Sequence, residues 1–248
     1  MPDEDADLEL LAEQRDFYRA DAEAFDEWLG TLLDEENDEP TARRYRAARG
    51  EIASLFQKWA PLGRVLEVAA GTGRLAPLYL AHAEAAVLLD TSPESLAIAS
   101  RRIGGVSTPE LVCADIFDWR PTGPHFDTVI FTAWLHHIPL GRFDDFWMAL
   151  DAVLAPNGRV LFDYPNARVA PPGSSDIPAE PTQEYGFYAP ADGISIRDHL
   201  GRRWRVVHNL WDPDNLTERL SRLGWATVDL GAGLFDNVRW AHAQRTAK

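Results

Sequence analysis

A glycine-rich turn follows a run of aliphatic residues in the segment VLEVAAGTGRLA, residues 65–76. Gly71, Gly73 and Ala76 have the spacing G-x-G-x-x-A, and Asp90 follows at about the 20-residue distance expected for a ribose-binding acid. When a parallel strand ends in such a turn, backbone amides and the N-terminus of the next helix meet at one point, so a ligand can approach the main chain closely. The segment therefore predicts a nucleotide-type cofactor, and this spacing alone is typical of NAD.

Two further acids distinguish between the cofactors that this turn could hold. Glu67 lies inside the predicted strand, where a carboxylate suits a ligand with an ammonium group but offers nothing to a pyrophosphate. Beyond the backbone and Thr72, the first helical turn has no extra donor for two phosphates. Asp115, in CADIFDW, ends a later strand and could accept a hydrogen bond from an adenine amino group. These features favour S-adenosylmethionine, with NAD as the alternative.

Two adjacent histidines, His136 and His137, lie in the sequence WLHHIP after a fourth predicted strand. This is the carboxyl edge at which open α/β sheets bind ligands. Because histidine titrates near neutrality, either residue could take a proton from a hydroxyl or amine. The alternative is that one packs under the following helix while the other is solvated.

Strand-like and helix-like segments alternate from Gly63 onward, which predicts an α/β fold with a doubly wound, mostly parallel sheet. We expect strands at RVLEVA, AAVLLD, ELVCAD, DTVIFT and RVLFDY, helices near residues 73–82, 92–103 and 140–154, and a turn at PNG. Later we expect a strand pair at ISIRDHL and RRWRVVHNLW, a helix at DPDNLTERLSRLG, and final strands at WATVDLG and NVRWAHAQ. The final strands share a short connection, so the last one must run antiparallel.

The predicted elements divide the chain into four parts. These are a helical N-terminal extension that covers the cofactor (1–60), a Rossmann-like core (61–164), a lid loop and strand pair of the acceptor site (165–210), and a final helix with two strands (211–248). The N-terminal extension reads as three helices, of which the first ends near Ala20.

Residues 165–193 are rich in proline and small polar residues, which predicts a lid or a disordered loop. Tyr185, Phe187 and Tyr188 would line an acceptor chamber if this loop closes.

The composition limits the partners that we expect. Lys and Arg total 24 against 39 Asp and Glu, and the net charge of −15 repels nucleic acid and anionic membranes. The acidic start, MPDEDADLEL, lacks the features of a signal peptide, so we expect a cytoplasmic protein, as a monomer or homodimer. The single cysteine, Cys113, excludes an internal disulfide, and we expect it to be buried.

Five segments together resemble the successive motifs of class I S-adenosylmethionine-dependent methyltransferases. They are VLEVAAGTG, LLDTSPESLAIA, CADIFDW, FDTVIFTAWLHHIP and LAPNGRVLFDY, and the end of the chain is similar to that of the family. The resemblance implies a seven-stranded sheet with an antiparallel last strand, and S-adenosylmethionine as cofactor. The chain departs from the pattern at Ala69, where the family usually has its first glycine.

The resemblance also implies roles for individual residues. The turn would lie against the methionine part of the cofactor: Ala69, Ala70, Gly71, Thr72 and Gly73. Glu67 would reach the amino group, and Tyr18 would approach the carboxylate.

Other residues would hold the nucleoside and the sulfonium. Asp90 with Thr91 would bind the ribose, and Asp115 with Ile116 the adenine. The floor near the sulfonium would be Phe131, Thr132 and Ala133. Trp28 and Trp134 could pack near this cation, and His137 is preferred to His136 as a base because similar family members keep a histidine at that point.

These observations predict a metal-independent methyltransferase that acts on a small-molecule metabolite. A sulfonium is already an activated electrophile, so the protein mainly has to align an acceptor and exclude water. C-x-x-C and H-E-x-x-H spacings are absent from the sequence, as are the acids of catechol-type enzymes and an Asn-Pro-Pro-Tyr sequence. The alternatives are an NAD-dependent oxidoreductase, and a non-methylating S-adenosylmethionine-binding protein or cyclase.

Overall fold

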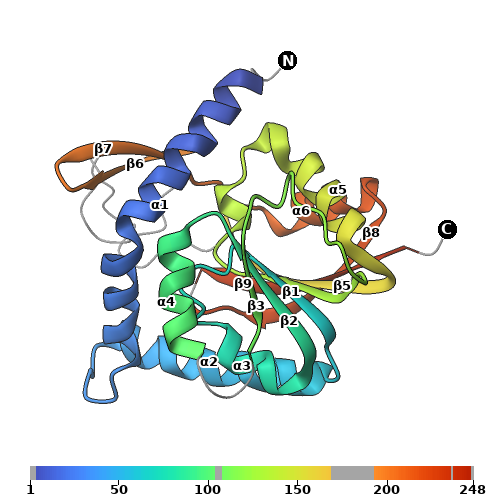
Figure 1. The fold of residues 1–248 in the computed structure, drawn as a ribbon, viewed down its shortest axis with the longest axis horizontal. Coiled ribbons are helices and arrows are strands. Elements are labelled where there is room, and N and C mark those ends of the chain that lie inside the picture. The colour runs from blue at the N-terminus through green and yellow to red at the C-terminus, as the bar shows by residue number, and fades with distance from the viewer. Residues whose placement is uncertain (1–3, 104–107, 169–192, 236, 247–248) are drawn as a thin grey trace.

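The computed structural model describes residues 4–103, 108–168, 193–235 and 237–246. At its centre is a seven-stranded sheet with the strand order β3-β2-β1-β4-β5-β9-β8 (Figure 1). The strands are β1 (Gly63–Val68), β2 (Ala83–Asp90), β3 (Glu110–Cys113), β4 (Phe126–Phe131), β5 (Leu154–Pro165), β8 (Trp225–Ala232) and β9 (Val238–Arg245). The first five strands pair in parallel, whereas β9 runs antiparallel to both β5 and β8. The prediction of a Rossmann-like sheet with an antiparallel last strand is confirmed.

Helices cover both faces of this sheet, because side chains of successive strand residues point to opposite faces. The helices after the first strand are α3 (Ala76–Tyr79), α4 (Pro93–Ile103), α5 (Phe143–Val153) and α6 (Pro213–Arg222). Leu66 and Val68 of β1 belong to the core cluster that includes residues of α5 and α6. Val65 belongs to the opposite cluster, which includes residues of α2 (Pro40–Trp59), α3 and α4. The two apolar layers hold the strand ends, and the turns after them, in one rigid frame.

The N-terminal extension contains two helices rather than the three predicted. Helix α1 (Glu4–Leu33) is continuous because neither proline nor glycine interrupts the chain between its acidic start and Gly30. Residues 34–39 form the break, and Pro40 starts α2 at a position where its missing N–H costs nothing. Figure 1 shows α1 running past α4 and the hairpin of β6 and β7.

A separate two-stranded sheet packs against α1. Strands β6 (Ile194–His199) and β7 (Arg202–Val207) pair antiparallel, as expected for the predicted strand pair. Trp204 and Val206 of β7 form a small core with Phe17 of α1. The backbone N–H of Val207 donates to Oε1 of the buried Gln14 at 2.9 Å. The hairpin therefore forms a wall that faces α1.

Two local predictions were wrong. Cys113 is exposed rather than buried, because β3 is a short strand at the edge of the sheet. Residues 156–158, predicted as a turn, lie within β5. Within the described part of the chain, no helix is long and apolar enough to cross a membrane.

Candidate active site

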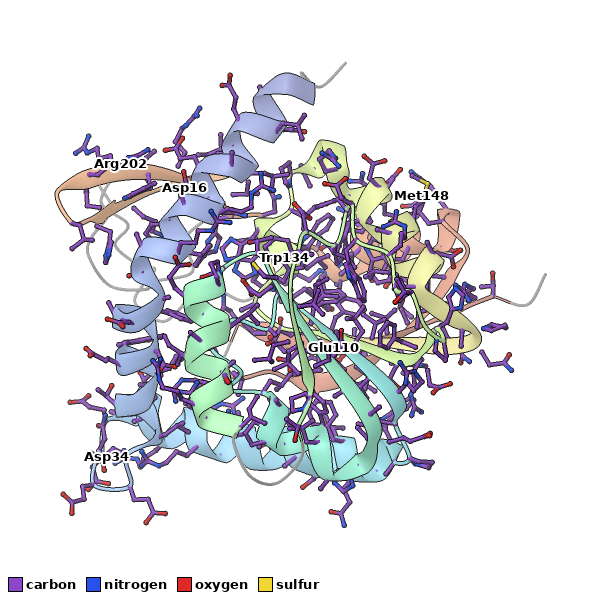
Figure 2. All side chains as sticks on the ribbon, in the orientation of Figure 1. Asp16, Asp34, Glu110, Trp134, Met148 and Arg202 are labelled. Atoms are coloured by element: carbon purple, nitrogen blue, oxygen red, sulfur yellow. The ribbon has the colours of Figure 1, made fainter. Side chains whose placement is uncertain are left out.

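A cavity of about 270 Å³ lies where the carboxyl ends of the central strands meet α1. Residues from the ends of β1 and β2, from the segment directly after β4, from α1 and from β6 line it. In Figure 2, Trp134, one of the lining residues, lies in the interior, in this view between α1 and α5. His136 and His137 of the 3₁₀ turn η2 (Leu135–His137) also line the cavity, whereas the described turns η1 (Leu80–His82) and η3 (Leu140–Arg142) do not. This is the position at which open α/β sheets bind ligands.

The turn after β1 uses left-handed backbone conformations. Gly71 and Gly73 have φ angles of 53° and 70°, and Ala69 has a φ of 52° despite its side chain. A left-handed alanine costs roughly 1–2 kcal/mol, so the surrounding contacts must hold this turn in place. A Cβ atom on Gly73 would lie 2.8 Å from the Cβ of Ala99, so Gly73 lets the turn pack closely on α4.

Glu67 is buried directly beneath the turn, with 2% of its surface exposed. The hydroxyl of Tyr79 donates to its Oε2 at 2.7 Å. Burial, opposed by this hydrogen bond and reinforced by the charge of Asp90, raises the pKa of Glu67 to about 8. Glu67 is therefore a neutral acid at pH 7, and a cationic ligand group beside it would ionise it.

Asp90, at the end of β2, joins the first two strand ends. Its Oδ2 accepts from the backbone N–H of Gly71, and its Oδ1 accepts from that of Ser92, each at 2.8 Å. Burial raises the pKa of Asp90, although these hydrogen bonds oppose the shift. The carboxylate thus holds the turn after β1 and also lines the cavity.

Asp115 lies at the next strand end, where α1 reaches it. Its Oδ2 is 2.6 Å from Nη1 of Arg15, and its Oδ1 accepts from the backbone N–H of Phe117 at 3.1 Å. The following residue, Ile116, is buried and lines the cavity. Because Arg15 is so distant from Asp115 in sequence, this ion pair could not be predicted from local patterns.

A second ion-pair network ties α1 to the glycine turn. Oδ1 of Asp26 accepts from Oγ1 of Thr72 at 2.7 Å and from Nε of Arg74 at 2.8 Å, and Oδ2 lies 2.8 Å from Nη2 of Arg102. Burial raises the pKa of Asp26, but the hydrogen bonds from Arg102, Thr72 and Arg74 outweigh it and leave the pKa below its usual value. Asp26 is therefore a charged anchor for α1.

His136, His137, His208 and Tyr18 line the side of the cavity that adjoins β7. The Nδ1 of His137 is 2.7 Å from the carbonyl oxygen of Val207, which can only accept, so Nδ1 carries the proton. Its Nε2 then accepts from the Tyr18 hydroxyl at 2.7 Å. The ring centroid of His136 lies 3.8 Å from that of His137, and His208 lies 5.0 Å from His136. All three rings are buried.

Burial keeps this histidine cluster neutral. It lowers the pKa of His137 and of His208 to about 3. Burial, together with the neighbouring rings, also places the pKa of His136 well below its usual value. The cluster therefore presents uncharged imidazoles to the cavity at neutral pH.

A buried acid shapes the turn after β4. Ala133 has a φ angle of 50°, and its backbone N–H donates to Oδ1 of Asp163 at 2.7 Å. Burial raises the pKa of Asp163 to about 7. Sequence reasoning missed Asp163 because it reads as one more residue of the strand RVLFDY.

Most of the predicted site residues line this one cavity. They are Tyr18, Glu67, Ala69, Ala70, Gly71, Thr72, Asp90, Thr91, Asp115, Ile116, Thr132, His136 and His137. Trp28, Ala133 and Trp134 also line it.

Two predicted site residues do not line the cavity, which corrects the expectation for them. Phe131 is fully buried, with its ring 5.3 Å from Phe146 and 5.2 Å from Phe162, because its position in β4 directs it into the core. Gly73 faces α4 instead. The lid residues Tyr185, Phe187 and Tyr188 lie outside the described residues.

Metal ligation has no support in the described ranges. No group of three or more histidine, cysteine, aspartate or glutamate residues there could hold a metal ion.

Comparisons with known proteins agree with this geometry. The sequence model of a methyltransferase domain matches residues 65–158. The structure is similar to the DhpI–SAH complex, with 26% identity, a TM-score of 0.72, and coverage of 96% of this chain and 98% of that one. It is also similar to the DhpI–SAM–HEP complex, with 28% identity, a TM-score of 0.69, and coverage of 94% and 97%. A search among curated proteins finds no match to this sequence.

A third solved structure shares the fold at lower identity. It is magnesium protoporphyrin IX methyltransferase (ChlM) from Synechocystis PCC 6803 with bound SAM, with 16% identity, a TM-score of 0.59, and coverage of 94% of this chain and 95% of that one. Together, the sheet order, the glycine turn and the domain match define a Rossmann-like methyltransferase domain. The domain match and the similar solved structures support a class I S-adenosylmethionine-dependent methyltransferase.

Proposed function

We propose that the chain transfers the methyl group of S-adenosylmethionine to a small-molecule acceptor, by alignment and without a metal. The observation that carries this proposal is that Glu67 and Asp90, from neighbouring strands, line one cavity on either side of the glycine turn. A ligand with an ammonium group at one end and a ribose in its middle would satisfy both acids. A pyrophosphate would gain nothing from Glu67.

The cofactor would extend along the strand ends. In this proposal, Glu67 pairs with the amino group, and the backbone of Ala69, Ala70, Gly71 and Thr72 lies against the methionine part. Asp90 and Thr91 hold the ribose hydroxyls, whereas Asp115 and Ile116 hold the adenine.

The carboxylate of the cofactor needs a cation or a hydroxyl. The sequence assigned this role to Tyr18, but its hydroxyl proton is donated to His137. Arg49 and Arg74 line the same cavity beside the turn: Nη1 of Arg49 donates to the carbonyl oxygen of Arg74 at 3.1 Å, and Nε of Arg74 is held by Oδ1 of Asp26 at 2.8 Å. We assign the carboxylate to these two arginines.

The acceptor would occupy the rest of the cavity, beyond Thr132. Aromatic side chains are prominent in the lining of the whole cavity: Phe17, Tyr18, Phe25, Trp28, Tyr45, Trp134 and Phe235. Their faces exclude water and attract a sulfonium. A small, partly apolar molecule fits this lining best.

A general-base role for His137 or His136 is the finer part of the proposal. Because Nε2 of His137 accepts from Tyr18, a proton from the acceptor can reach His137 only through the Tyr18 hydroxyl. Its pKa of about 3 also makes His137 a weak base. His136 is buried behind it, with 3% of its surface exposed. Full turnover by a His137→Gln variant would exclude His137 as a base and leave it only the role of positioning Tyr18.

Isothermal titration with S-adenosylmethionine, S-adenosylhomocysteine and NAD tests the cofactor. Glu67→Ala should weaken binding of the two amino-acid ligands by at least about tenfold, the value of one charge-assisted contact. Glu84→Ala, an exposed acid on β2, is the matched control and should bind like the wild type. No binding by the wild type at millimolar concentration would exclude the proposal.

Mass spectrometry tests the reaction. The protein is incubated with S-adenosylmethionine and a host-cell metabolite extract, and the mixture is searched for new compounds heavier by one methylene. Bound donor without any methylated product would favour a non-transferring protein instead.

A further inference from the structure

Asp21, an acid with no role in the proposed cofactor binding, lines the same cavity. It lies on α1, and only 2% of its surface is exposed. Among the residues that the structure describes, none donates a hydrogen bond to its Oδ2. A buried carboxylate oxygen without a donor is costly. Its presence in the wall of a cavity therefore indicates that a bound molecule supplies the missing donor.

The other oxygen of Asp21 is held by a histidine. Oδ1 lies 3.2 Å from Nδ1 of His199, which ends β6. Nε2 of the same ring lies 3.3 Å from the carbonyl oxygen of Ala20, which can only accept, so Nε2 carries a proton. Oδ1 and Nδ1 therefore form an ion pair when His199 is protonated. The His199 side chain is 18% exposed and links the pair to solvent.

Burial and neighbouring charges change the pKa of Asp21. Burial raises its pKa, and the charges of His199 and Arg197, both on β6, only partly oppose this. Tyr18, from the same helix, and His208 also line the cavity. Because His208 has a pKa of about 3, it is neutral and adds no charge near Asp21 at pH 7. The raised pKa makes Asp21 a stronger proton acceptor than an ordinary aspartate.

We propose that Asp21 is the catalytic base for an acceptor that carries an O–H or N–H group, and that His199 positions it. This inference rests on the proposed methyl transfer. The acceptor lone pair forms the bond to the methyl carbon, and the carbon–sulfur bond breaks with its electron pair left on sulfur. The acceptor proton moves to Oδ2 of Asp21. The products are the methylated acceptor, neutral S-adenosylhomocysteine and a protonated Asp21.

A binding measurement separates this inference from the proposed function. S-adenosylhomocysteine is titrated into the wild type, Asp21→Asn and the control Asp16→Asn, whose side chain is 59% exposed on the same helix (Figure 2). Failure of the wild type to bind would refute the proposed function. Equal binding by all three proteins is expected, because Asp21 holds no part of the cofactor. Loss of binding by Asp21→Asn alone would make Asp21 a cofactor or folding residue and overturn the inference.

A transfer measurement then tests the base. Label from S-adenosyl-L-[methyl-³H]methionine is followed into a host-cell metabolite extract at several pH values. Asp21→Asn should lower the rate about 100-fold or more, the usual contribution of a general base, while Asp16→Asn matches the wild type. His199→Gln should move the rising limb of the pH profile to higher pH, because the histidine charge that lowers the pKa of Asp21 is lost. A purely structural role would lower the rate equally at every pH, and transfer by Asp21→Asn within about twofold of wild type contradicts the inference.

A titration without any acceptor gives an independent answer. Carbon-13 NMR of protein labelled at the aspartate Cγ, with the Asp21 signal assigned from Asp21→Asn, reports its protonation directly. The Asp21 pKa should lie above the usual aspartate value and rise further in His199→Gln. The inference is overturned if the measured pKa of Asp21 lies at or below the usual aspartate value, or if it does not change in His199→Gln. This result does not depend on whether the extract contains an acceptor.

Discussion

The hydroxyl of Tyr18 lies 2.7 Å from Nε2 of His137 and joins α1 to the segment after β4. The same histidine is held through Nδ1 by the carbonyl of Val207 at 2.7 Å, and its backbone carbonyl accepts from Nε2 of Gln14 at 2.9 Å. One imidazole therefore connects the covering helix, the core sheet and the hairpin wall. This arrangement fixes the shape of the cavity between them.

Removal of the Tyr18 hydroxyl should destabilise the protein. Tyr18→Phe leaves the buried Nε2 of His137 without its hydroxyl donor, which costs roughly 1–3 kcal/mol, measured by chemical denaturation. A double-mutant cycle with His137→Leu checks the cause. The coupling free energy should be about 1 kcal/mol, and a value near zero would show that the hydrogen bond contributes nothing.

The raised pKa of Glu67 should appear as a pH-dependent stability. The pKa rises from its usual 4.5 to about 8 on folding, so the folded protein binds a proton that the unfolded chain releases between these values. Glu67 therefore destabilises the empty protein progressively as the pH rises from 4.5 to 8. Glu67→Gln, which can still accept from Tyr79, should raise the free energy of unfolding at pH 8 by about 4 kcal/mol and change it little at pH 4.5. Equal effects at both pH values would contradict a protonated Glu67.

Cofactor binding should release that proton. Pairing with an ammonium group ionises Glu67, so titration of S-adenosylhomocysteine at pH 7 in buffers of different ionisation enthalpy should show the release of up to about one proton. The release should disappear in Glu67→Gln. Release that persists unchanged in this variant would assign the proton to another group.

The buried histidines should cause acid destabilisation. Burial lowers the pKa of His208 from 6.5 to about 3. Between these pH values the histidine is protonated in the unfolded chain and neutral in the folded protein. The stability linked to this group is fully present above pH 6.5 and is lost as the pH falls toward 3. In His208→Asn, the loss of unfolding free energy between pH 6 and 5 should be smaller by about 1 kcal/mol. The exposed His125→Asn is the control and should follow the wild type.

Asp26 should control the release of the cofactor. Its bonds to Thr72, Arg74 and Arg102 hold α1 against the glycine turn. In Asp26→Asn, loss of a charge-assisted contact should speed dissociation of S-adenosylhomocysteine about tenfold in stopped-flow displacement. Asp16→Asn on the same helix should leave the rate unchanged. An unchanged rate in Asp26→Asn would mean that α1 does not have to move for release.

Local patterns in the sequence were enough to predict the sheet and most of the residues that line the cavity at the sheet edge. Alternating apolar strands and the turn at Gly71 and Gly73 depend on residues a few positions apart, so they are readable directly. Acids at strand ends, such as Asp90 and Asp115, could be assigned to one edge because parallel strands bring their carboxyl ends together.

The contacts between α1 and the rest of the chain were decided only by the tertiary structure, because they depend on how distant segments pack against one another. The pairs Tyr18 with His137 and Asp21 with His199 join α1 to segments more than a hundred positions away, and no periodicity encodes such a contact. The side on which Phe131 packs was likewise set by the core around it. The glycine turn is thus encoded in the local sequence, whereas the cavity beside it exists only because α1 and the hairpin pack next to the sheet edge.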